Sequence, residues 1–162
     1  MEIKEIWHEM FEYWKDTCKC IGATNEQIEK LKENIKTNIP QELIVSLKCC
    51  NSVLQQVELS SCCLSVGKCF MLLNIDNIIE LYQDGLEYGY VPDKFYIPIA
   101  DWNGDIFLFI HTLDKTIIYQ DLESSIYNRL IFNTYKEFLV HIKNTILQKG
   151  SFDYEDLQKL IA

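Results

Sequence analysis

Residues 96–120, YIPIADWNGDIFLFIHTLDKTIIYQ, form the stretch that decides the fold. The dipeptide Asn103-Gly104 lies between two apolar runs, and it is a strong hairpin signal because both residues accept the positive φ angles of a type I′ turn. We therefore predict two antiparallel strands joined by a two-residue turn. The register of this hairpin pairs Trp102 with Asp105 and Ala100 with Phe107.

A third strand is expected directly after the hairpin. The apolar run Thr116–Tyr119 follows a turn near Asp114-Lys115, so it extends the hairpin into a meander. Pro98 lies in the first strand and has no N–H to donate to a neighbouring strand. We therefore place that strand at a sheet edge, or leave position 98 unpaired.

The N-terminal part of the chain has helical patterns. Residues 2–21 carry apolar side chains at spacings of three or four, which predicts an amphipathic helix, and Gly22 ends it. Thr24 and Gln27 form a capping-box pattern at the start of a second helix. Pro40 suits the first turn of a third helix.

The middle of the chain changes from helical to strand patterns and back. Residues 53–73 contain short runs of β-branched, aromatic and cysteine residues, which predict two strands. Asn74 can cap a helix that stops near Gly85, and a loop over residues 85–93 follows.

The C-terminal part is helical again. Thr134 and Glu137 form a second capping box, and the helix that they begin ends at Gly150. A last short helix starts at about Asp153. The order of elements predicts an α+β fold, in which N-terminal and C-terminal helices pack around a curved antiparallel sheet.

The composition is that of one folded domain spanning residues 1–162. Hydrophobic residues make up 48% of the chain, which is ample for a core. No apolar run approaches the roughly 20 residues of a membrane-spanning helix, and the first residues mix charged with apolar side chains in place of a secretory signal. We therefore expect a cytoplasmic protein that does not bind membranes.

The net charge limits the class of partner. The chain has 15 basic and 24 acidic residues, for a formal net charge of −9. Affinity for nucleic acid depends on Lys and Arg displacing counterions from phosphates, so a nucleic-acid partner is not expected. A basic protein partner suits the negative field better.

The seven cysteines are interpreted as reduced thiols. Their number is odd and four of them are adjacent in sequence, which suits no regular disulfide framework. The adjacent pairs are Cys49/Cys50 and Cys62/Cys63. The two-residue spacing of paired zinc ligands is also missing, including at Cys18-x-Cys20, so we expect buried cysteines and no metal site.

The remaining motifs do not match an active site. A calcium loop could begin with Asp101, Asn103 and Asp105, but its sixth and twelfth positions hold Ile106 and Thr112 in place of Gly and Glu. None of the three histidines has the local signature of a Cys–His nucleophile pair, and the glycines match no phosphate-binding loop. We expect no enzymatic activity, no cofactor and no small-molecule substrate.

Acidic residues are concentrated in one region. Residues 84–123 contain eight acids and two lysines, a net charge of −6, and the rest of the chain accounts for −3. Asp101 and Asp105 flank the predicted hairpin tip beside Trp102, which favours an acidic surface with an aromatic anchor. The alternative is a solvated acidic rim with Trp102 folded into the core. The candidate partner-binding residues are Asp84, Glu87, Asp93, Asp101, Trp102, Asp105 and Asp114.

Several segments together resemble one known family. They are residues 22–31 (GATNEQIEKL), residues 39–43 (IPQEL), residues 96–101 (YIPIAD) followed by Gly104-Asp105, residues 118–121 (IYQD) and residues 132–139 (FNTYKEFL). In this order they are similar to the SUKH superfamily of Smi/Knr-like domains, of the bacterial toxin-immunity type. The resemblance implies the α+β fold, a cognate protein toxin as the partner, and no catalytic residues to carry over.

Three functions stay open at this point. The first hypothesis is neutralisation of a cognate toxin, such as a basic nuclease, by stoichiometric binding. The second is a regulatory or scaffold module of the kind that acts in cell-wall or stress signalling. The third is an unrecognised enzyme or metal protein that uses the cysteines.

Overall fold

The computed structural model of the chain describes residues 1–55, 61–67, 69–124 and 126–162. Its helices are α1 (Ile3–Trp14), α2 (Asn25–Asn34), α3 (Gln41–Cys49), α4 (Ile75–Tyr88), α5 (Tyr135–Lys149) and α6 (Tyr154–Lys159). Its strands are β1 (Cys18–Ile21), β2 (Ser52–Gln55), β3 (Phe70–Leu72), β4 (Tyr96–Trp102), β5 (Ile106–His111), β6 (Ile117–Asp121) and β7 (Ile126–Phe132). The α+β class is confirmed, as are strands at both ends of the predicted strand region; residues 56–60 of that region lie outside the described residues.

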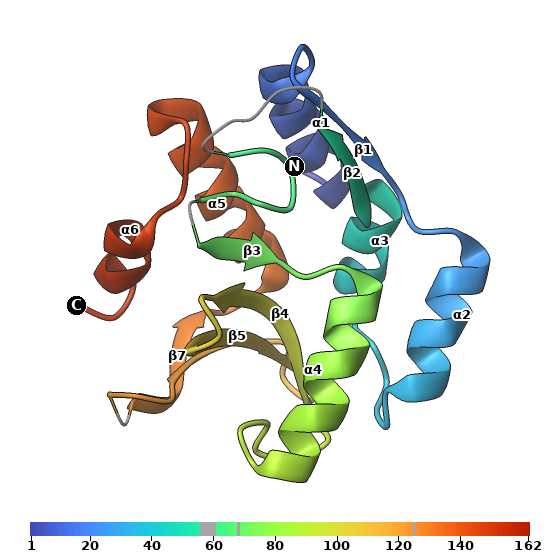
Figure 1. Ribbon diagram of the computed structural model, residues 1–162, viewed down its shortest axis with the longest axis vertical. Coiled ribbons are helices and arrows are strands. Elements are labelled where there is room, and N and C mark those ends of the chain that lie inside the picture. The colour runs from blue at the N-terminus through green and yellow to red at the C-terminus, as the bar shows by residue number, and fades with distance from the viewer. Residues whose placement is uncertain (56–60, 68, 125) are drawn as a thin grey trace.

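The larger sheet has the strand order β3-β4-β5-β6-β7, and every neighbouring pair is antiparallel. Helices surround it: α4 contacts β4, α5 contacts β7, and α1 packs against α3 and α5 (Figure 1). β1 and β2 form a separate two-stranded sheet beside α1, and α2 packs against α4. A continuous hydrophobic core joins these layers.

The central hairpin has the predicted turn but a different register. The Asn103-Gly104 dipeptide has positive φ at both residues, 52° and 78°. Trp102 nevertheless pairs with Ile106 and not with Asp105, so the predicted register is wrong by one residue. The same shift pairs Ala100 with Leu108 and Asp101 with Phe107. Asp105 belongs to the turn, since its N–H donates a hydrogen bond to the Trp102 carbonyl at 3.1 Å, while its own carbonyl accepts one from Leu122 N at 3.0 Å.

Pro98 lies in β4, an internal strand, so its predicted place at a sheet edge is wrong. The alternative prediction, that position 98 is unpaired, holds on the side that faces β3. β3 pairs only with residues 100–102 of β4, and its ladder therefore ends before Pro98. On the other side Pro98 faces Phe109, next to a register shift between Pro98 and Ala100. Proline is tolerated at such an irregularity because the ladder requires no donor there.

β7 forms the far edge of the sheet and was not predicted. Its pairing with β6 is irregular, with register shifts between Ile117 and Ile118 and between Tyr119 and Asp121. Asn128 within this strand has a positive φ of 53°. Two bulges in one strand pair blur the alternation of side chains by which a strand is recognised in a sequence.

The predicted helix over residues 2–21 is wrong in its last third. α1 ends after Trp14, whose carbonyl accepts hydrogen bonds from both Thr17 N and Thr17 Oγ1 at 2.9 Å. Residues 18–21 then form β1. Cys18 and Ile21 continue the helical spacing of three or four by coincidence, which is why the sequence pattern has no visible break.

α4 continues past Gly85, where the sequence predicted its end, and stops at Tyr88. Gly89 supplies the left-handed end with a φ of 89°. Gly85 instead permits a close approach: a Cβ at this position would lie 2.9 Å from the Cβ of Val91. The predicted loop over residues 85–93 therefore begins only at Gly89.

A buried polar contact joins three helices in the core. Ser46 Oγ on α3 accepts hydrogen bonds from Trp7 Nε1 of α1 and from the Tyr135 hydroxyl of α5, each at 2.8 Å. Burial raises the pKa of Tyr135 to about 12, so this phenol stays protonated. The predicted N-caps are also present: Thr134 Oγ1 accepts a hydrogen bond from Glu137 N, and Thr24 Oγ1 from Gln27 N, each at 3.1 Å.

The interpretation of every cysteine as a reduced thiol is wrong. Cys18 is bonded to Cys62, and Cys20 is bonded to Cys50. Each disulfide joins one cysteine of a sequence-adjacent pair, Cys62 or Cys50, to a cysteine of β1. Adjacency in sequence therefore did not prevent disulfide formation. Cys63 stays a buried thiol with its Sγ 3.5 Å from that of Cys18, and burial raises its pKa to about 12.

Candidate partner-binding surface

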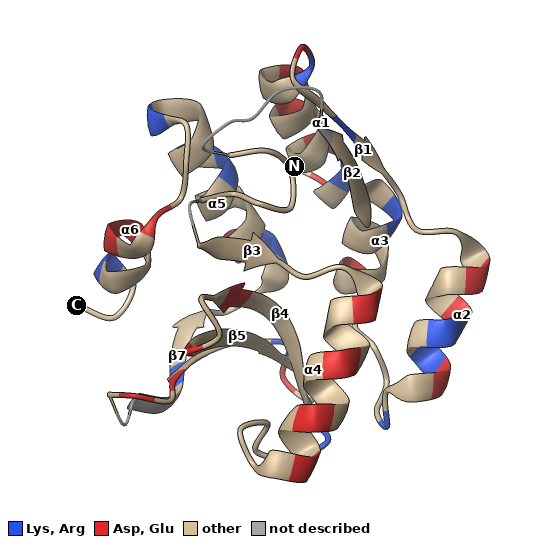
Figure 2. Ribbon diagram, viewed as in Figure 1, with Lys and Arg blue, Asp and Glu red and all other residues tan. Residues whose placement is uncertain are grey.

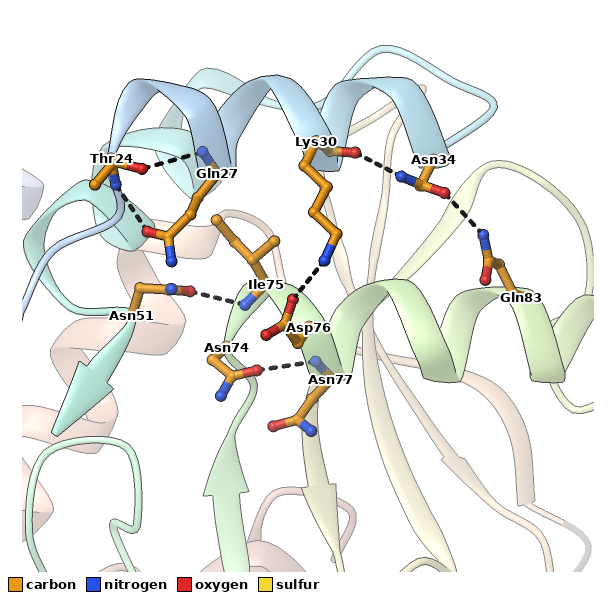
Figure 3. Close-up of polar contacts among 10 residues, drawn as sticks. All are labelled: Thr24, Gln27, Lys30, Asn34, Asn51, Asn74, Ile75, Asp76, Asn77 and Gln83. Atoms are coloured by element: carbon orange, nitrogen blue, oxygen red, sulfur yellow. Dashed lines mark hydrogen bonds and ion pairs between the residues drawn. The ribbon is translucent and has the colours of Figure 1, made fainter.

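The N-terminus of α4 is fixed by two asparagines (Figure 3). Asn74 Oδ1 accepts a hydrogen bond from Asn77 N at 2.9 Å, and Asn51 Oδ1 accepts one from Ile75 N at 2.8 Å. These side chains satisfy N–H groups that have no partner within the helix. These two hydrogen bonds fix the position of the first turn of α4.

Contacts with α2 hold the same helix along its length (Figure 3). Lys30 Nζ lies 3.1 Å from Asp76 Oδ1, and Gln83 Nε2 donates a hydrogen bond to Asn34 Oδ1 at 3.0 Å. Both pairs are exposed, so each contributes little stability by itself. They link α4 to α2 at its first turn and again near Gln83.

Acidic residues recur along the length of α4 (Figure 2). Asp84 and Glu87 are among the predicted residues, and Asp76 and Glu80 precede them at a spacing of four residues. The sequence prediction missed Asp76 and Glu80 because it counted acids only from residue 84 onward. The i, i+4 spacing within the predicted helix was the signal that could have found them.

The last turn of α4 carries negative charge, although the C-terminal end of a helix favours positive charge. The C-terminus of a helix carries a partial negative charge, which stabilises cations and destabilises anions. α4 has Asp84 and Glu87 near this end and no basic residue in its last turn. Among the described residues, neither acid forms an ion pair. Residues that break a local rule without compensation are expected at functional sites.

Two tyrosines follow these acids at the end of α4. Tyr88 is 74% exposed, the largest exposed fraction among the large apolar side chains described. Tyr90 is half-buried and stacks on Phe107 of β5, with ring centroids 5.3 Å apart. Gln120 Nε2 also donates a hydrogen bond to the Tyr90 carbonyl at 2.7 Å. A tyrosine held this firmly loses little conformational entropy when a partner packs on it.

Three carboxylates from two elements act electrostatically on the Tyr90 hydroxyl. Burial raises the pKa of Tyr90, and the negative charges of Asp84, Glu80 and Asp101 raise it further. Asp101 reaches this place because it pairs with Phe107, on which Tyr90 stacks. We call Glu80, Asp84, Tyr88, Tyr90 and Asp101 the acid–tyrosine surface.

Asp101 also organises the neighbouring turn. Its Oδ1 accepts a hydrogen bond from Gly104 N at 2.8 Å. Burial raises the pKa of the Asp101 carboxyl, the Gly104 hydrogen bond opposes this, and the Asp105 charge adds to the rise. Asp101 and Asp105 thus lie together at the hairpin tip, as the sequence predicted.

The other predicted residues lie elsewhere. Asp93 and Asp114 are near Tyr96, at the opposite end of β4 from Asp101, and a strand of that length spans roughly 20 Å. Asp114 holds its own turn by accepting hydrogen bonds from Thr116, which lower its pKa. Trp102 is half-buried, with its ring centroid 4.6 Å from that of Tyr154 on α6.

A hollow of about 370 Å³ borders the acid–tyrosine surface. It is lined by Tyr88, Gly89, Tyr90, Pro92, Gln120, Leu122 and Asn128. Gln120 is 3% exposed, and its Oε1 is buried without a hydrogen-bond partner among the described residues. An unpaired buried acceptor costs free energy, so Gln120 is a costly residue to place beneath this hollow.

The fold is an α+β domain with carboxylates and phenols gathered at the C-terminal end of α4 and at the hairpin tip. The family comparison agrees, because the SMI1 / KNR4 family (SUKH-1) matches residues 22–141. The chain belongs to this family, as its resemblance to the SUKH superfamily predicted. No curated protein matches the chain. Within the described residues, no helix is both long and apolar enough to cross a membrane.

Proposed function

We propose that this chain is a non-catalytic immunity protein that neutralises a cognate toxin by binding it in a stoichiometric complex. The observation that carries the proposal is the exposed ring of Tyr88 next to the stacked ring of Tyr90, whose hydroxyl is subject to the negative charges of three carboxylates. Family membership supports a role in binding a protein and is equally compatible with a regulatory module. The chemistry of the surface favours a basic partner, such as a nuclease that itself binds phosphate.

The partner that fits this surface offers arginine or lysine side chains. A guanidinium group stacks on tyrosine and pairs with carboxylates, and the negative charges of Asp84 and Asp101 act at Tyr90. The hollow lined by Tyr88 and Tyr90 would admit one such side chain. The surface thus combines aromatic anchors with exposed carboxylates.

The remaining predicted residues take a second role in this proposal. Glu87 and Asp105 border the acid–tyrosine surface, where they would meet the rim of the partner. Asp93 and Asp114 lie too far along β4 to join the same contact, and they would add to long-range attraction. Because exposed charges act through solvent, their contribution falls as salt is added. Trp102, packed on Tyr154, would contribute only if α6 is part of the interface.

The test is co-expression of the chain with the protein encoded by the neighbouring gene. We expect protection of the host cell and a complex of equal stoichiometry on purification. Tyr88→Ala removes an exposed aromatic anchor and should weaken the complex by about 30-fold, the effect of losing a hot-spot side chain. Asp84→Asn should slow association and reduce its dependence on salt.

Glu33→Gln on α2 is the matched control for Asp84→Asn. Both changes remove one negative charge from a helix, but Glu33 lies outside the acid–tyrosine surface. Asp84→Asn also removes an anion from a helix C-terminus, so a loss of binding cannot be ascribed to loss of stability. Equal effects of the two variants would contradict the proposed surface. Absence of binding and protection with every adjacent gene product would contradict the immunity function and favour the regulatory or scaffold alternative.

A further inference from the structure

Five of the seven cysteines meet in one place, which we call the sulfur cluster. Its members are Cys18, Cys20, Cys50, Cys62 and Cys63. They come from β1, from the residue after α3 and from the segment before β3, so segments distant in sequence converge on it. The two free cysteines outside it are Cys49 and Cys69.

The sulfur atoms form two overlapping groups of three. The Sγ atoms of Cys18, Cys62 and Cys63 lie within 4.8 Å of one another, and so do those of Cys20, Cys50 and Cys63. In a tetrahedral zinc site with Zn–S bonds of about 2.3 Å, neighbouring sulfurs are about 3.8 Å apart. Cys63 and Cys18, at 3.5 Å, are already close to that separation.

The backbone at Cys63 explains how adjacent cysteines reach one cluster. Successive side chains of an extended chain point in opposite directions, which would carry Cys62 and Cys63 apart. Cys63 has a φ of 47°, in the left-handed region that residues other than glycine rarely adopt. Such costly conformations concentrate at ligand-binding positions. Two disulfide bonds leave the fifth sulfur without a covalent partner, so they do not account for this arrangement.

We propose that the reduced chain binds one zinc ion in the sulfur cluster. Cys63, the member common to both groups, and three of the other four cysteines supply the tetrahedral ligands. A dithiol reductant opens each disulfide: it gives two electrons and two protons to the bonded sulfurs and becomes a disulfide itself. Zinc then replaces the protons of four thiols. The disulfide-bonded and zinc-bound forms exclude each other, and each ties β1 to α3 and to the segment around residue 62.

The experiment measures metal in the full chain. The protein is produced in zinc-supplemented medium, purified without oxygen in a phosphine reductant that is not a thiol, and analysed by elemental mass spectrometry. We expect one zinc ion per chain, and replacement by cobalt should give the intense visible bands of tetrahedral thiolate coordination. Cys63→Ala should lower the zinc affinity by more than about tenfold. Cys69→Ala, the same change at an exposed cysteine outside the cluster, should leave it unaltered.

Either of two results would overturn the proposal: a reduced wild-type chain without stoichiometric zinc, or equal affinities in the Cys63→Ala and Cys69→Ala variants. Circular dichroism establishes whether Cys63→Ala folds. If it does not, Cys18→Ala and Cys20→Ala replace it, because at least one of these two cysteines must be a ligand when three of the other four are. Cobalt spectra of both variants identical to that of the wild type in position, intensity and affinity would then count against the site.

Discussion

Gly85→Ala is expected to destabilise the protein, although alanine is the better residue for a helix interior. The helix preference alone would stabilise the variant by about 1 kcal/mol. The added Cβ, however, would lie 2.9 Å from both Val91 Cβ and Tyr90 Cε2, well inside the ordinary carbon contact of about 3.5–4.0 Å. Overpacking of this kind costs about 1–3 kcal/mol. The net loss should therefore lie between about 0 and 2 kcal/mol, toward the upper value because the added Cβ also overlaps Val91 Cγ2, its closest neighbour.

Urea denaturation measures this loss as a lower midpoint with an unchanged slope. In a thermal melt, each kcal/mol corresponds to about 2–4 °C for a chain of this size. Val91→Ala tests the assigned cause. Val91 is 1% exposed, and removing its two methyl groups costs about 1.6 kcal/mol by itself. In the double variant the methyl group added at position 85 occupies the vacated space, so the combined loss should be smaller than the sum by about 1 kcal/mol.

The reasoning fails if Gly85→Ala unfolds at a higher urea concentration than the wild type. That result would mean that Val91 and Tyr90 yield to the methyl group at no cost. Simple additivity of the two substitutions would also refute the assigned contact, because residues that share one space must be energetically coupled.

Three further predictions concern the core and α5. Ser46→Ala removes the acceptor of the Trp7 and Tyr135 hydrogen bonds and should lower the free energy of unfolding in urea by about 1–3 kcal/mol; an unchanged midpoint would contradict this. Because burial raises the pKa of Tyr135 to about 12, the unfolded chain ionises first, so stability should be intact below pH 10 and fall between about pH 10 and 12. Tyr135→Phe should remove part of that fall, and equal slopes in the two proteins would refute the assignment. Thr134→Ala deprives Glu137 N of its acceptor and should cost about 1 kcal/mol, measured by thermal melting, with Thr134→Ser as the control that retains the cap.

The features that the sequence predicted correctly are those whose cause is local. A cap needs only the residues within one turn, and Thr134 with Glu137 is such a case. The Asn103-Gly104 turn likewise depends on backbone preference at two adjacent positions. The α+β class followed from the order of these local signals.

The features that the sequence prediction missed depend on contacts between distant segments. β1 exists because residues 18–21 pair with β2, and no property of those residues alone distinguishes them from a fourth turn of helix. Gly85 resembled a helix end because the residue packed on it, Val91, comes later in the chain. Of the candidate surface, Asp84 and Asp101 were found from charge alone, whereas Tyr88 and Tyr90 become recognisable only when α4 and β5 are placed together.

The irregular pairing of β7 affects how molecules of this protein behave toward one another. The border strand of a sheet can template the addition of another chain, and Leu130 in β7 is 52% exposed. The bulges opposite β6 and the left-handed backbone of Asn128 twist this border away from a flat ladder. A neighbouring copy therefore meets a distorted strand that is poorly suited to edge-to-edge association. The irregular backbone of β7 is thus a built-in obstacle to the addition of a strand from another copy at this edge.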